Sequence, residues 1–406
     1  MIAVIGLGYV GLPMSLMMAA NGLAVTGVDI NEEVISSLKN GKTTFDEEGM
    51  DALYARAVEN GIRFDTSCPK ADTYIVSVPT PYMKLSKKID PTYVTSAVSG
   101  VLDVCEKGCL IVVESTISPG TIDTHVRPLI EKRGLKIGGD VHLAHAPERI
   151  FPGNTLYELK NVSRTIGADS REIAERVRAI YSSFCTAEIS LTDIRTAEMS
   201  KVVENTYRDI NIAYANELAR ICRVTGLDVY ETIRIANTHP RVNILNPGPG
   251  VGGHCIPIDP WFLVGDYPGL ANLIFTARKC NDSMPEYVLE RACDIMREHG
   301  IKDVSRVGLY GISYKEDVDD TRESPTLQIL KCMEKHLSFG VKAYDPFVKK
   351  PVMDGQYMDF NEFLSSVDLV IIMVGHTHII ENMDALKSKV VLDTKNVCPF
   401  ETAHRL

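Results

Sequence analysis

MIAVIGLGYVGLPMSLMMAANGLAVTGVDI, residues 1–30, is the stretch that decides the fold. Residues 3–5 are apolar and short enough for a buried strand, residues 12–20 suit a helix, and residues 24–29 suit a second strand. Pro13 fits this helix because proline is tolerated in a first helical turn. Similar strand and helix signals alternate through residues 74–79, 110–114 and 142–146. This alternation predicts an α/β fold with a parallel sheet covered by helices on both faces.

Three glycines follow the first predicted strand in the motif GLGYVG, residues 6–11. Gly6 permits a tight turn, Gly8 lets the backbone approach a pyrophosphate, and Gly11 allows close packing of the next helix. The N-terminus of that helix offers N–H groups and a positive dipole end to phosphates. Asp29 ends the second strand, where a carboxylate accepts the ribose hydroxyls and repels a 2′-phosphate. The pattern predicts a dinucleotide site that prefers NAD to NADP.

Hydroxyl side chains follow two later strands of the same lobe, in VPTP at residues 78–81 and EST at residues 114–116. Ligands of open α/β sheets bind outside the carboxyl ends of the strands. Thr80 and Thr116 are therefore expected to line the cofactor cleft. Ordinary turn hydroxyls would give the same pattern, and the sequence leaves that alternative open.

A long helix is predicted from residue 193 to residue 224, because no glycine or proline interrupts the chain before Gly226. After a Gly- and Pro-rich loop at residues 246–260, a second strand–helix–strand series begins at residues 306–310. Its later strands are expected at residues 341–344, 369–374 and 390–392. Asp345 ends a strand there, as Asp29 does in the first series. We predict two Rossmann-like parallel-sheet lobes joined by a long central helix and a helical middle domain.

Three polar residues of the long helix, Lys201, Asn205 and Arg208, are spaced so that they share one face. A solvated polar face would show the same spacing. A chain that binds a phosphorylated ligand needs local cations, however, and a cofactor site makes a neighbouring polar substrate site an expected feature. We therefore interpret this face as part of a substrate site.

Cys255 lies in the loop segment GGHCIPIDP, residues 252–260. Two preceding glycines let backbone and substrate come close together. Asp259, four residues later, could act as a base or orient a water if the loop curls back as a helical turn. Most cysteines are structural thiols, but this setting in an NAD-binding chain favours a nucleophile.

A charged segment, SYKEDVDDTRESP at residues 313–325, follows the first strand of the last lobe. Lys315 and Arg322 could reach a phosphate or a carboxylate at that strand end. A charged surface turn is the alternative.

Composition limits the remaining possibilities. The chain has 406 residues, 45% of them hydrophobic, and a formal net charge of −10, which disfavours a nucleic-acid or anionic-membrane surface. The sequence contains no run of about 18 apolar residues, so we expect no membrane-spanning helix. We also expect no signal peptide. The ten cysteines are scattered without a CxxC pair, so we expect no disulfide framework and a cytoplasmic protein. No metal site is predicted.

Taken together, these motifs resemble those of the UDP-glucose/GDP-mannose dehydrogenase family, the NAD-dependent four-electron sugar-nucleotide 6-dehydrogenases. The similar blocks occur in family order over essentially the whole chain: GLGYVG, VPTP, ESTISPGT, APER, AEMSKVVENTYRDINIAYANE, GVGGHC and SYKEDVDDTRESP. The resemblance implies an NAD-binding Rossmann domain at residues 1–192 and a central helical dimerisation domain at residues 193–298. It also implies a Rossmann-like UDP-sugar-binding domain at residues 299–406, and a homodimer or higher homo-oligomer.

The resemblance also implies roles for individual residues. Cys255 becomes the nucleophile that captures an aldehyde as a thiohemiacetal and later a thioester, and Lys201 becomes the proton donor or acceptor and oxyanion stabiliser, with Asn205 beside it. Asp259 and Glu148 resemble residues that activate water and hydrolyse the thioester. The implied cofactor contacts are Gly6, Gly8, Tyr9, Val10, Gly11, Asp29, Thr80, Thr116 and Arg322. The implied substrate contacts, some from the partner subunit, are Arg149, Ile150, Lys201, Asn205, Arg208, His239, Arg241, Gly252, Tyr314 and Lys315.

One departure from the family pattern bears on the substrate. The glucose and mannose enzymes typically carry Ser before this cysteine and Lys before the aspartate, where this chain has His254 and Ile258. The block from residue 239 to residue 263 resembles instead the members that oxidise N-acetylated sugars. The resemblance thus implies oxidation of UDP-N-acetyl-D-mannosamine at C6 for polysaccharide biosynthesis. UDP-N-acetyl-D-glucosamine remains the alternative, and another UDP-sugar is a more distant one.

Overall fold

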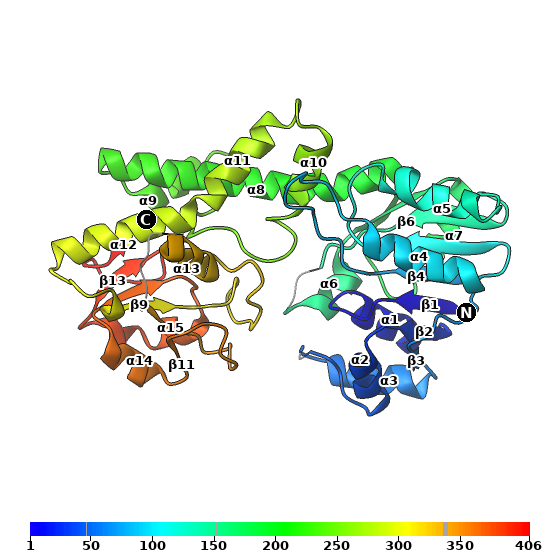
Figure 1. The fold of residues 1–406 in the computed structure, drawn as a ribbon, viewed down its shortest axis with the longest axis horizontal. Helices are drawn as coiled ribbons and strands as arrows, with labels where there is room; N and C mark the ends of the chain where they lie inside the picture. The colour runs from blue at the N-terminus through cyan, green and yellow to red at the C-terminus, as the bar shows by residue number, and fades with distance from the viewer. Residues whose placement is uncertain (46, 151–152, 336–339) are drawn as a thin grey trace. The chain divides into compact units, whose positions relative to one another are not determined.

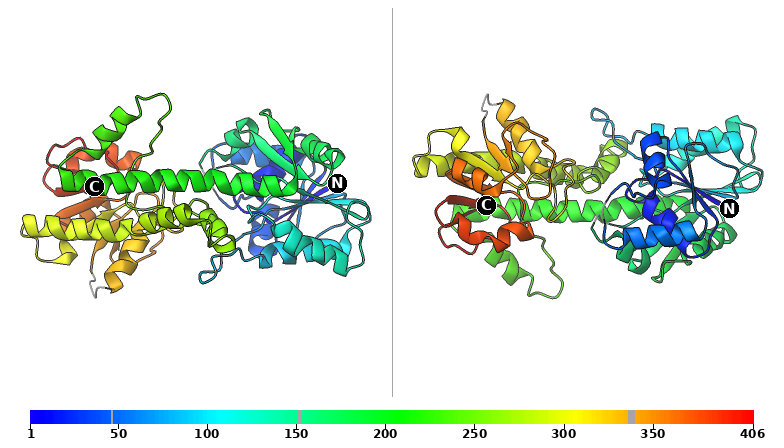
Figure 2. Two further views of the ribbon diagram at one scale, coloured as in Figure 1. Left: turned by 90° about the horizontal axis from the view of Figure 1, so that it is seen from above. Right: turned by 90° about the horizontal axis from the view of Figure 1, so that it is seen from below.

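The computed structural model describes residues 1–45, 47–150, 153–335 and 340–406. The chain forms two compact units, Met1–Glu204 and Asn205–Leu406, and each contains its own sheet (Figure 1). Helix α8, Ile194–Thr225, runs from the first unit into the second and is seen as one continuous helix in Figure 2. Gly226 follows it with φ +72°, a conformation that favours glycine after a helix end. The prediction of a long helix is confirmed.

The first unit is built on an eight-stranded sheet with the order β3-β2-β1-β4-β5-β6-β7-β8. Its strands are β1 (Ile2–Ile5), β2 (Val25–Val28), β3 (Arg63–Asp65), β4 (Thr73–Val76), β5 (Cys109–Val113), β6 (Val141–His145), β7 (Arg164–Ala168) and β8 (Ile189–Thr192). The strands β1 to β6 are parallel and have the strand order of a dinucleotide-binding fold. The predicted Rossmann-like lobe is confirmed.

One strand pair departs from the predicted parallel sheet. β6 and β7 are antiparallel, and β8 pairs parallel to β7. The described part of the connection between β6 and β7 holds one helix, α6 (Thr155–Asn161). This connection spans 18 residues, close to the 19 residues between the parallel strands β1 and β2, so its length alone does not account for the reversed direction.

Helices cover both faces of this sheet. Strand residues Val4, Ile75 and Val112 join one apolar core with α1 and α7. Helix α4 packs against β4, and its buried residues Val94 and Val98 lie outside that core, which places α4 on the other face. The helices of this unit are α1 (Gly11–Ala20), α2 (Glu32–Lys39), α3 (Met50–Glu59), α4 (Thr92–Val104), η1 (Ile122–Val126), α5 (Arg127–Lys132), α6 and α7 (Arg171–Tyr181).

The second unit is built on a six-stranded sheet with the order β11-β10-β9-β12-β13-β14, and its described strand pairs are all parallel. Its strands are β9 (Val307–Tyr310), β10 (Lys342–Tyr344), β11 (Gln356–Tyr357), β12 (Leu369–Ile372), β13 (Val390–Asp393) and β14 (His404–Arg405). Leu309 and Ile371 face a core with α12 and α13, whereas Tyr310 and Ile372 face a core with α14 and α15. The sheet is thus covered on both faces, as predicted.

The helices of the second unit include the carboxyl-terminal part of α8. The others are α9 (Val229–Ala236), α10 (Asp259–Asp266), α11 (Asn272–Asp282), α12 (Met284–Glu298), η2 (Val304–Arg306), α13 (Pro325–Lys335), α14 (Phe360–Ser366), α15 (Thr377–Glu381) and η3 (Met383–Leu386). Among the described residues, no helix is both long and apolar enough to span a membrane.

The two sheets repeat one local arrangement at the end of their first strand. Gly6 follows β1 with φ +90°, and Gly311 follows β9 with φ +93°. The next N–H donates to the aspartate that ends the neighbouring strand, from Leu7 to Asp29 Oδ2 at 2.8 Å and from Ile312 to Asp345 Oδ2 at 2.6 Å. The second series of strands therefore repeats the first in geometry.

The two aspartates differ in their surroundings. Asp29 is partly exposed, and its other oxygen accepts from Asn31 N–H at 2.9 Å. Asp345 is only 2% exposed. Its oxygens also accept from the N–H groups of Ser313 at 2.9 Å, Phe347 at 2.8 Å and Val348 at 3.1 Å. The surroundings leave Asp29 open to solvent and enclose Asp345.

Candidate active site

The glycine turn after β1 is shaped by close backbone contacts. A Cβ on Gly6 would lie 2.2 Å from Ser77 O, and one on Gly11 would lie 1.9 Å from Gly6 O, so neither position accepts a side chain. Gly8 is different, because a Cβ there would meet no atom within 4 Å, and the residue is exposed. The missing side chain at Gly8 leaves open space above the turn, which fits the close approach of a pyrophosphate. Of the two other predicted contacts in this turn, Val10 precedes α1 and the Tyr9 ring lies 4.5 Å from the Phe45 ring.

The loops after β4 and β5 are joined at the same edge of the sheet. Ser115 Oγ accepts from Val78 N–H at 2.8 Å and donates to Val78 O at 2.7 Å. Thr80 and Thr116 follow within these loops, and both are partly buried. Ser115 was noted in the EST segment, but this role in joining the two loops was not predicted for it.

A buried ionic cluster lies beneath the APER segment. Arg164 of β7 forms ion pairs with Glu148 and with Glu114, the latter at 3.2 Å, and all three side chains are buried. Arg149 N–H donates to Glu148 Oε1 at 2.6 Å. The guanidinium of Arg164 lies 4.4 Å from the Tyr181 ring. These contacts fix the position of the Glu148 carboxylate.

The two residues after Glu148 are held within the first unit. The guanidinium of Arg149 pairs with Glu204 of α8, and its Nη1 donates to Ser163 O at 2.6 Å. Ile150 is partly buried and packs against the core of α1 and α7. Arg164 and Glu204 were overlooked in the sequence, because nothing in their local pattern distinguishes them from surface charges, and Glu114 was noted only as part of the EST segment.

The polar face of α8 is not a solvated surface. Lys201 is 8% exposed and Asn205 is 4% exposed, while Arg208 is partly buried. Lysine side chains usually keep their ammonium group in water, and a buried lysine is rare. The burial of Lys201 therefore suggests a specific role. The solvated alternative is wrong for Lys201 and Asn205.

The Cys255 loop closes into a helical turn, the arrangement under which Asp259 was expected to act as a base or to orient a water. Cys255 O accepts from Ile258 N–H at 3.0 Å and from Asp259 N–H at 2.9 Å, and Asp259 begins α10. Asn205 Nδ2 donates to Asp259 Oδ2 at 2.6 Å, and both groups are buried. The second unit thus brings Asn205 of α8 and the Cys255–Asp259 turn together.

The glycines before Cys255 hold the loop against the charged segment. A Cβ on Gly252 would lie 2.6 Å from Tyr314 Cβ, and Gly253 N–H donates to Arg322 O at 2.9 Å. Arg322 is exposed, and its guanidinium pairs with Asp320 at 2.5 Å. Lys315 follows Tyr314 in the same segment and is partly buried.

His254, beside Cys255, is neutral in this environment. Burial lowers the pKa of its imidazole, and the charge of Arg322 lowers it further, to about 4. Its Nδ1 atom is buried without a hydrogen-bond partner among the described residues. An uncharged imidazole therefore precedes Cys255 in the loop.

His239 and Arg241 lie apart from this framework. Both are exposed in the segment after α9, where Arg241 N–H donates to His239 Nδ1 at 3.3 Å. The contacts that the structure shows for them belong to their own segment. Because both side chains are exposed, the structure of the single chain does not support the prediction that His239 and Arg241 contact the substrate.

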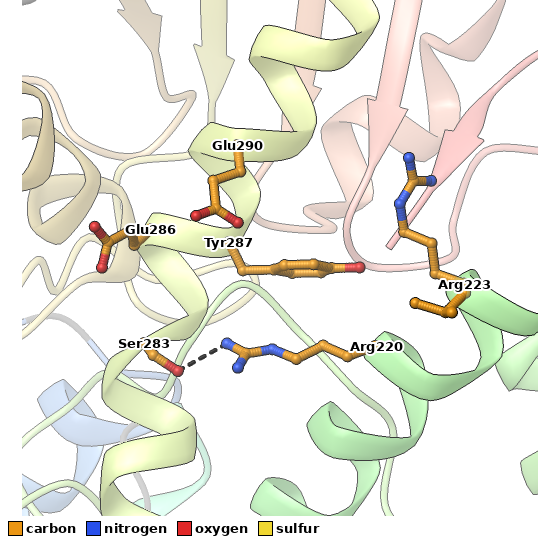
Figure 3. Close-up of a pocket in the computed structure, with 7 residues that line it drawn as sticks. Arg220, Arg223, Ser283, Glu286, Tyr287 and Glu290 are labelled. Atoms are coloured by element: carbon orange, nitrogen blue, oxygen red, sulfur yellow. Dashed lines mark hydrogen bonds between the residues drawn. The ribbon is translucent and has the colours of Figure 1, made fainter.

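A cavity of about 610 Å³ opens between α8 and α12 in the second unit (Figure 3). Arg220 Nη2 donates there to Ser283 Oγ at 2.7 Å, and its guanidinium lies 5.0 Å from the Tyr287 ring. The cavity is lined by Arg220, Arg223, Val224, Ser283, Glu286, Tyr287 and Glu290. None of the predicted site residues lines it, so it is a separate feature from the candidate active site.

Comparisons with known proteins match nearly the whole chain. Three domains of the UDP-glucose/GDP-mannose dehydrogenase family match the chain: the NAD binding domain at residues 1–185, the central domain at residues 195–283 and the UDP binding domain at residues 308–399. A UDP-N-acetyl-D-mannosamine dehydrogenase of Methanocaldococcus jannaschii is 42% identical over 98% of this chain and 92% of its own length. An NDP-N-acetyl-D-galactosaminuronic acid dehydrogenase of Ralstonia solanacearum is 38% identical over 98% of this chain and 96% of its own length.

Solved structures show the same relationship. The UDP-N-acetyl-mannosamine dehydrogenase of Staphylococcus aureus has a TM-score of 0.90 and 40% identity, and the match covers 100% of this chain and 97% of that one. The match of the NAD binding domain confirms the predicted cofactor, and the sequence resemblance is confirmed over the full chain. The protein is therefore a member of the UDP-glucose/GDP-mannose dehydrogenase family, an NAD-dependent UDP-sugar dehydrogenase.

Proposed function

We propose that this protein oxidises C6 of UDP-N-acetyl-D-mannosamine to a carboxylate, with UDP-N-acetyl-D-mannosaminuronate as the product. The observation that carries the proposal is the Cys255–Asp259 turn, in which the partly buried Cys255 lies one helical turn from Asp259, whose buried carboxylate accepts from the Asn205 amide. A thiol so placed suits covalent capture of an aldehyde, which a simple alcohol dehydrogenase does not need. The names of the M. jannaschii and S. aureus proteins support the choice of sugar.

The proposed chemistry assigns each step to a residue of this chain. The two oxidations require two NAD molecules in succession, each of which would supply the acceptor for one hydride when bound. Lys201 takes the proton of the C6 hydroxyl and stabilises the oxyanion that develops. The Cys255 thiolate adds to the aldehyde to form a thiohemiacetal, and the second oxidation converts this adduct to a thioester. Water, activated by Asp259 or Glu148, attacks the thioester carbonyl and releases the carboxylate and the free thiol.

Binding residues are proposed for each ligand. For NAD we propose Gly6, Gly8, Tyr9, Val10, Gly11, Asp29, Thr80, Thr116 and Arg322. For the UDP-sugar we propose Arg149, Ile150, Lys201, Asn205, Arg208, His239, Arg241, Gly252, Tyr314 and Lys315. The exposure of His239 and Arg241 favours a contribution to the site of a partner subunit over one to their own.

A homodimer in which α8 lies at the interface is also proposed. Tyr207, Tyr214 and Ile221 follow one another at seven-residue spacing on α8, and each is more than half exposed. This spacing places them on one helix face, and an exposed apolar stripe of this kind suits packing against another helix. We further propose domains at residues 1–192, 193–298 and 299–406, a cytoplasmic location and a role in polysaccharide biosynthesis.

The choice of sugar is tested by comparing kcat/KM for UDP-N-acetyl-D-mannosamine, UDP-N-acetyl-D-glucosamine and UDP-glucose under one condition. A pocket built to pair an acetamido group leaves its polar groups unpaired when the sugar carries a hydroxyl. We expect UDP-N-acetyl-D-mannosamine to exceed UDP-glucose by about 10²-fold. The glucosamine epimer differs only in the orientation of one group and is the alternative substrate. UDP-glucose as the best substrate would contradict an N-acetyl pocket.

Cofactor choice is tested at Asp29. Its carboxylate and a 2′-phosphate would repel each other, so kcat/KM should favour NAD over NADP by about 10²-fold or more. Asp29→Asn removes the charge and keeps an oxygen that accepts from Leu7 N–H, so it should reduce this preference. Asp51→Asn, at an exposed position of α3, is the matched control and should keep the wild-type ratio. Equal kcat/KM for the two cofactors in the wild-type protein would contradict the role of Asp29.

A further inference from the structure

We propose that Glu298, His299 and His404 bind a zinc ion that fastens strand β14 to the end of helix α12. Nε2 of His299 lies 3.0 Å from Nε2 of His404. One ligand atom from each of the three residues lies within 4.8 Å of the others. Glu298 ends α12, His299 follows it, and His404 belongs to β14, so the cluster joins two elements of the second unit.

The donor set and its spacing suit zinc. Two imidazoles and one carboxylate form a known type of zinc site, which leaves a fourth position for water. With zinc–nitrogen bonds of about 2.0–2.1 Å, two ligating nitrogens of a tetrahedral site lie about 3.3 Å apart. The observed separation of the two imidazole nitrogens is close to this value, and the two rings stand at 89° to each other, so both nitrogens can face one ion without stacking of the rings.

Two nearby arginines, Arg223 and Arg291, both lie near the Asp294 carboxylate, at 3.8 and 3.9 Å, which offsets part of their positive charge.

The position of the cluster suggests that the ion stabilises the attachment of β14 to the end of α12. β14 is a two-residue edge strand that pairs with β13 through His404 and Arg405. His299 and His404 are 105 residues apart in the sequence, and a cross-link that closes a long loop removes the most conformational freedom from the unfolded chain. The same separation explains why no metal site was predicted from the sequence, because metal motifs are recognised from ligands at short spacings.

The test measures zinc binding by isothermal titration and thermal unfolding of the full chain after treatment with a chelator. A Cys255→Ser background is used, since a reactive thiol is itself a zinc ligand. We expect one zinc ion per chain and a Tm that rises by about 5 °C at a free zinc concentration about 100 times Kd. Cobalt in place of zinc should give the intense visible absorption of a tetrahedral site.

Matched variants assign the ion to these residues. His299→Ala and His404→Ala should each abolish the zinc-dependent rise in Tm, measured against the metal-free Tm of the same variant. Glu298→Gln should weaken binding, and His125→Ala, at an exposed histidine of the first unit, should leave the rise unchanged. Absence of a zinc-dependent rise in the background protein would overturn the proposal. A rise that persists in both histidine variants would overturn it too, because the ion would then bind elsewhere.

Discussion

Replacing Cys255 with alanine is expected to abolish formation of the uronate. Without the thiol, the aldehyde has no nucleophile to hold it, and no thioester can form for hydrolysis. The wild-type protein should produce two NADH per sugar at completion, whereas the variant should produce at most one, slowly, with free aldehyde as its product. We expect the rate of acid formation to fall by at least about 10³-fold, within the range seen when a nucleophile is removed. End-point NADH counting and chromatography of the sugar nucleotide measure both effects.

Two further variants make this result specific to Cys255. Cys293→Ala removes an exposed thiol on α12 and should leave the stoichiometry at two. Cys255→Ser keeps the size of the side chain but not the reactivity of a thiolate, and should resemble the alanine variant in acid formation. A stoichiometry of two NADH in Cys255→Ala would show that water attacks the aldehyde directly and that the covalent mechanism is wrong.

The second large effect is expected at Lys201. Lys201→Ala should lower kcat by about 10²–10³-fold, the usual cost of losing one group that stabilises a developing oxyanion. Unlike the cysteine change, this change should slow the first hydride transfer itself. Single-turnover formation of the first NADH, read by absorbance, distinguishes the two variants.

Controls for Lys201 separate chemistry from packing. Lys201→Met retains most of the buried side-chain volume and should lose as much activity as the alanine variant, because the ammonium group is absent in both. Lys331→Ala, at an exposed position of α13, should leave kcat unchanged. Near-normal acid production by Lys201→Met would show that the ammonium group plays no part in the reaction.

Those parts of the fold that depend on local pattern were predictable. The predicted strand at residues 24–29 and helix at residues 12–20 correspond to β2 (Val25–Val28) and α1 (Gly11–Ala20), because runs of buried residues bounded by glycines have strong local signals. The short strands β3, β11 and β14 were missed, since two or three residues carry no periodicity. Strands β7 and β8 were not predicted either, and the antiparallel pairing of β7 with β6 depends on tertiary contacts and not on the strand's own residues.

In the candidate site too, local features were predictable and long-range contacts were not. The turn from Cys255 to Asp259 could be foreseen from spacing along the chain. The bond from Asn205 to Asp259 joins residues 54 positions apart, and the ion pair of Arg164 with Glu114 joins residues 50 positions apart. Long-range partners of this kind are chosen by the tertiary fold, and a charged residue in a sequence does not reveal which opposite charge it will meet.

The enclosed carboxylate of Asp345 has no lone pair left for a nucleotide ligand. A carboxylate has about four lone-pair sites. At Asp345 backbone N–H groups of Ile312, Ser313, Phe347 and Val348 occupy them. His376, whose Nδ1 accepts from Asp317 N–H at 2.9 Å and whose Nε2 therefore carries the proton, donates a fifth bond at 3.2 Å.

The hydroxyl groups of a ribose bound in the second lobe could not donate to Asp345, because its lone-pair sites are already occupied. Asp29, with two backbone donors and solvent beside it, still has such capacity. Two lobes of the same strand order thus differ in the hydrogen-bonding capacity of one aspartate, and we expect an adenosine ribose to bind in the first lobe.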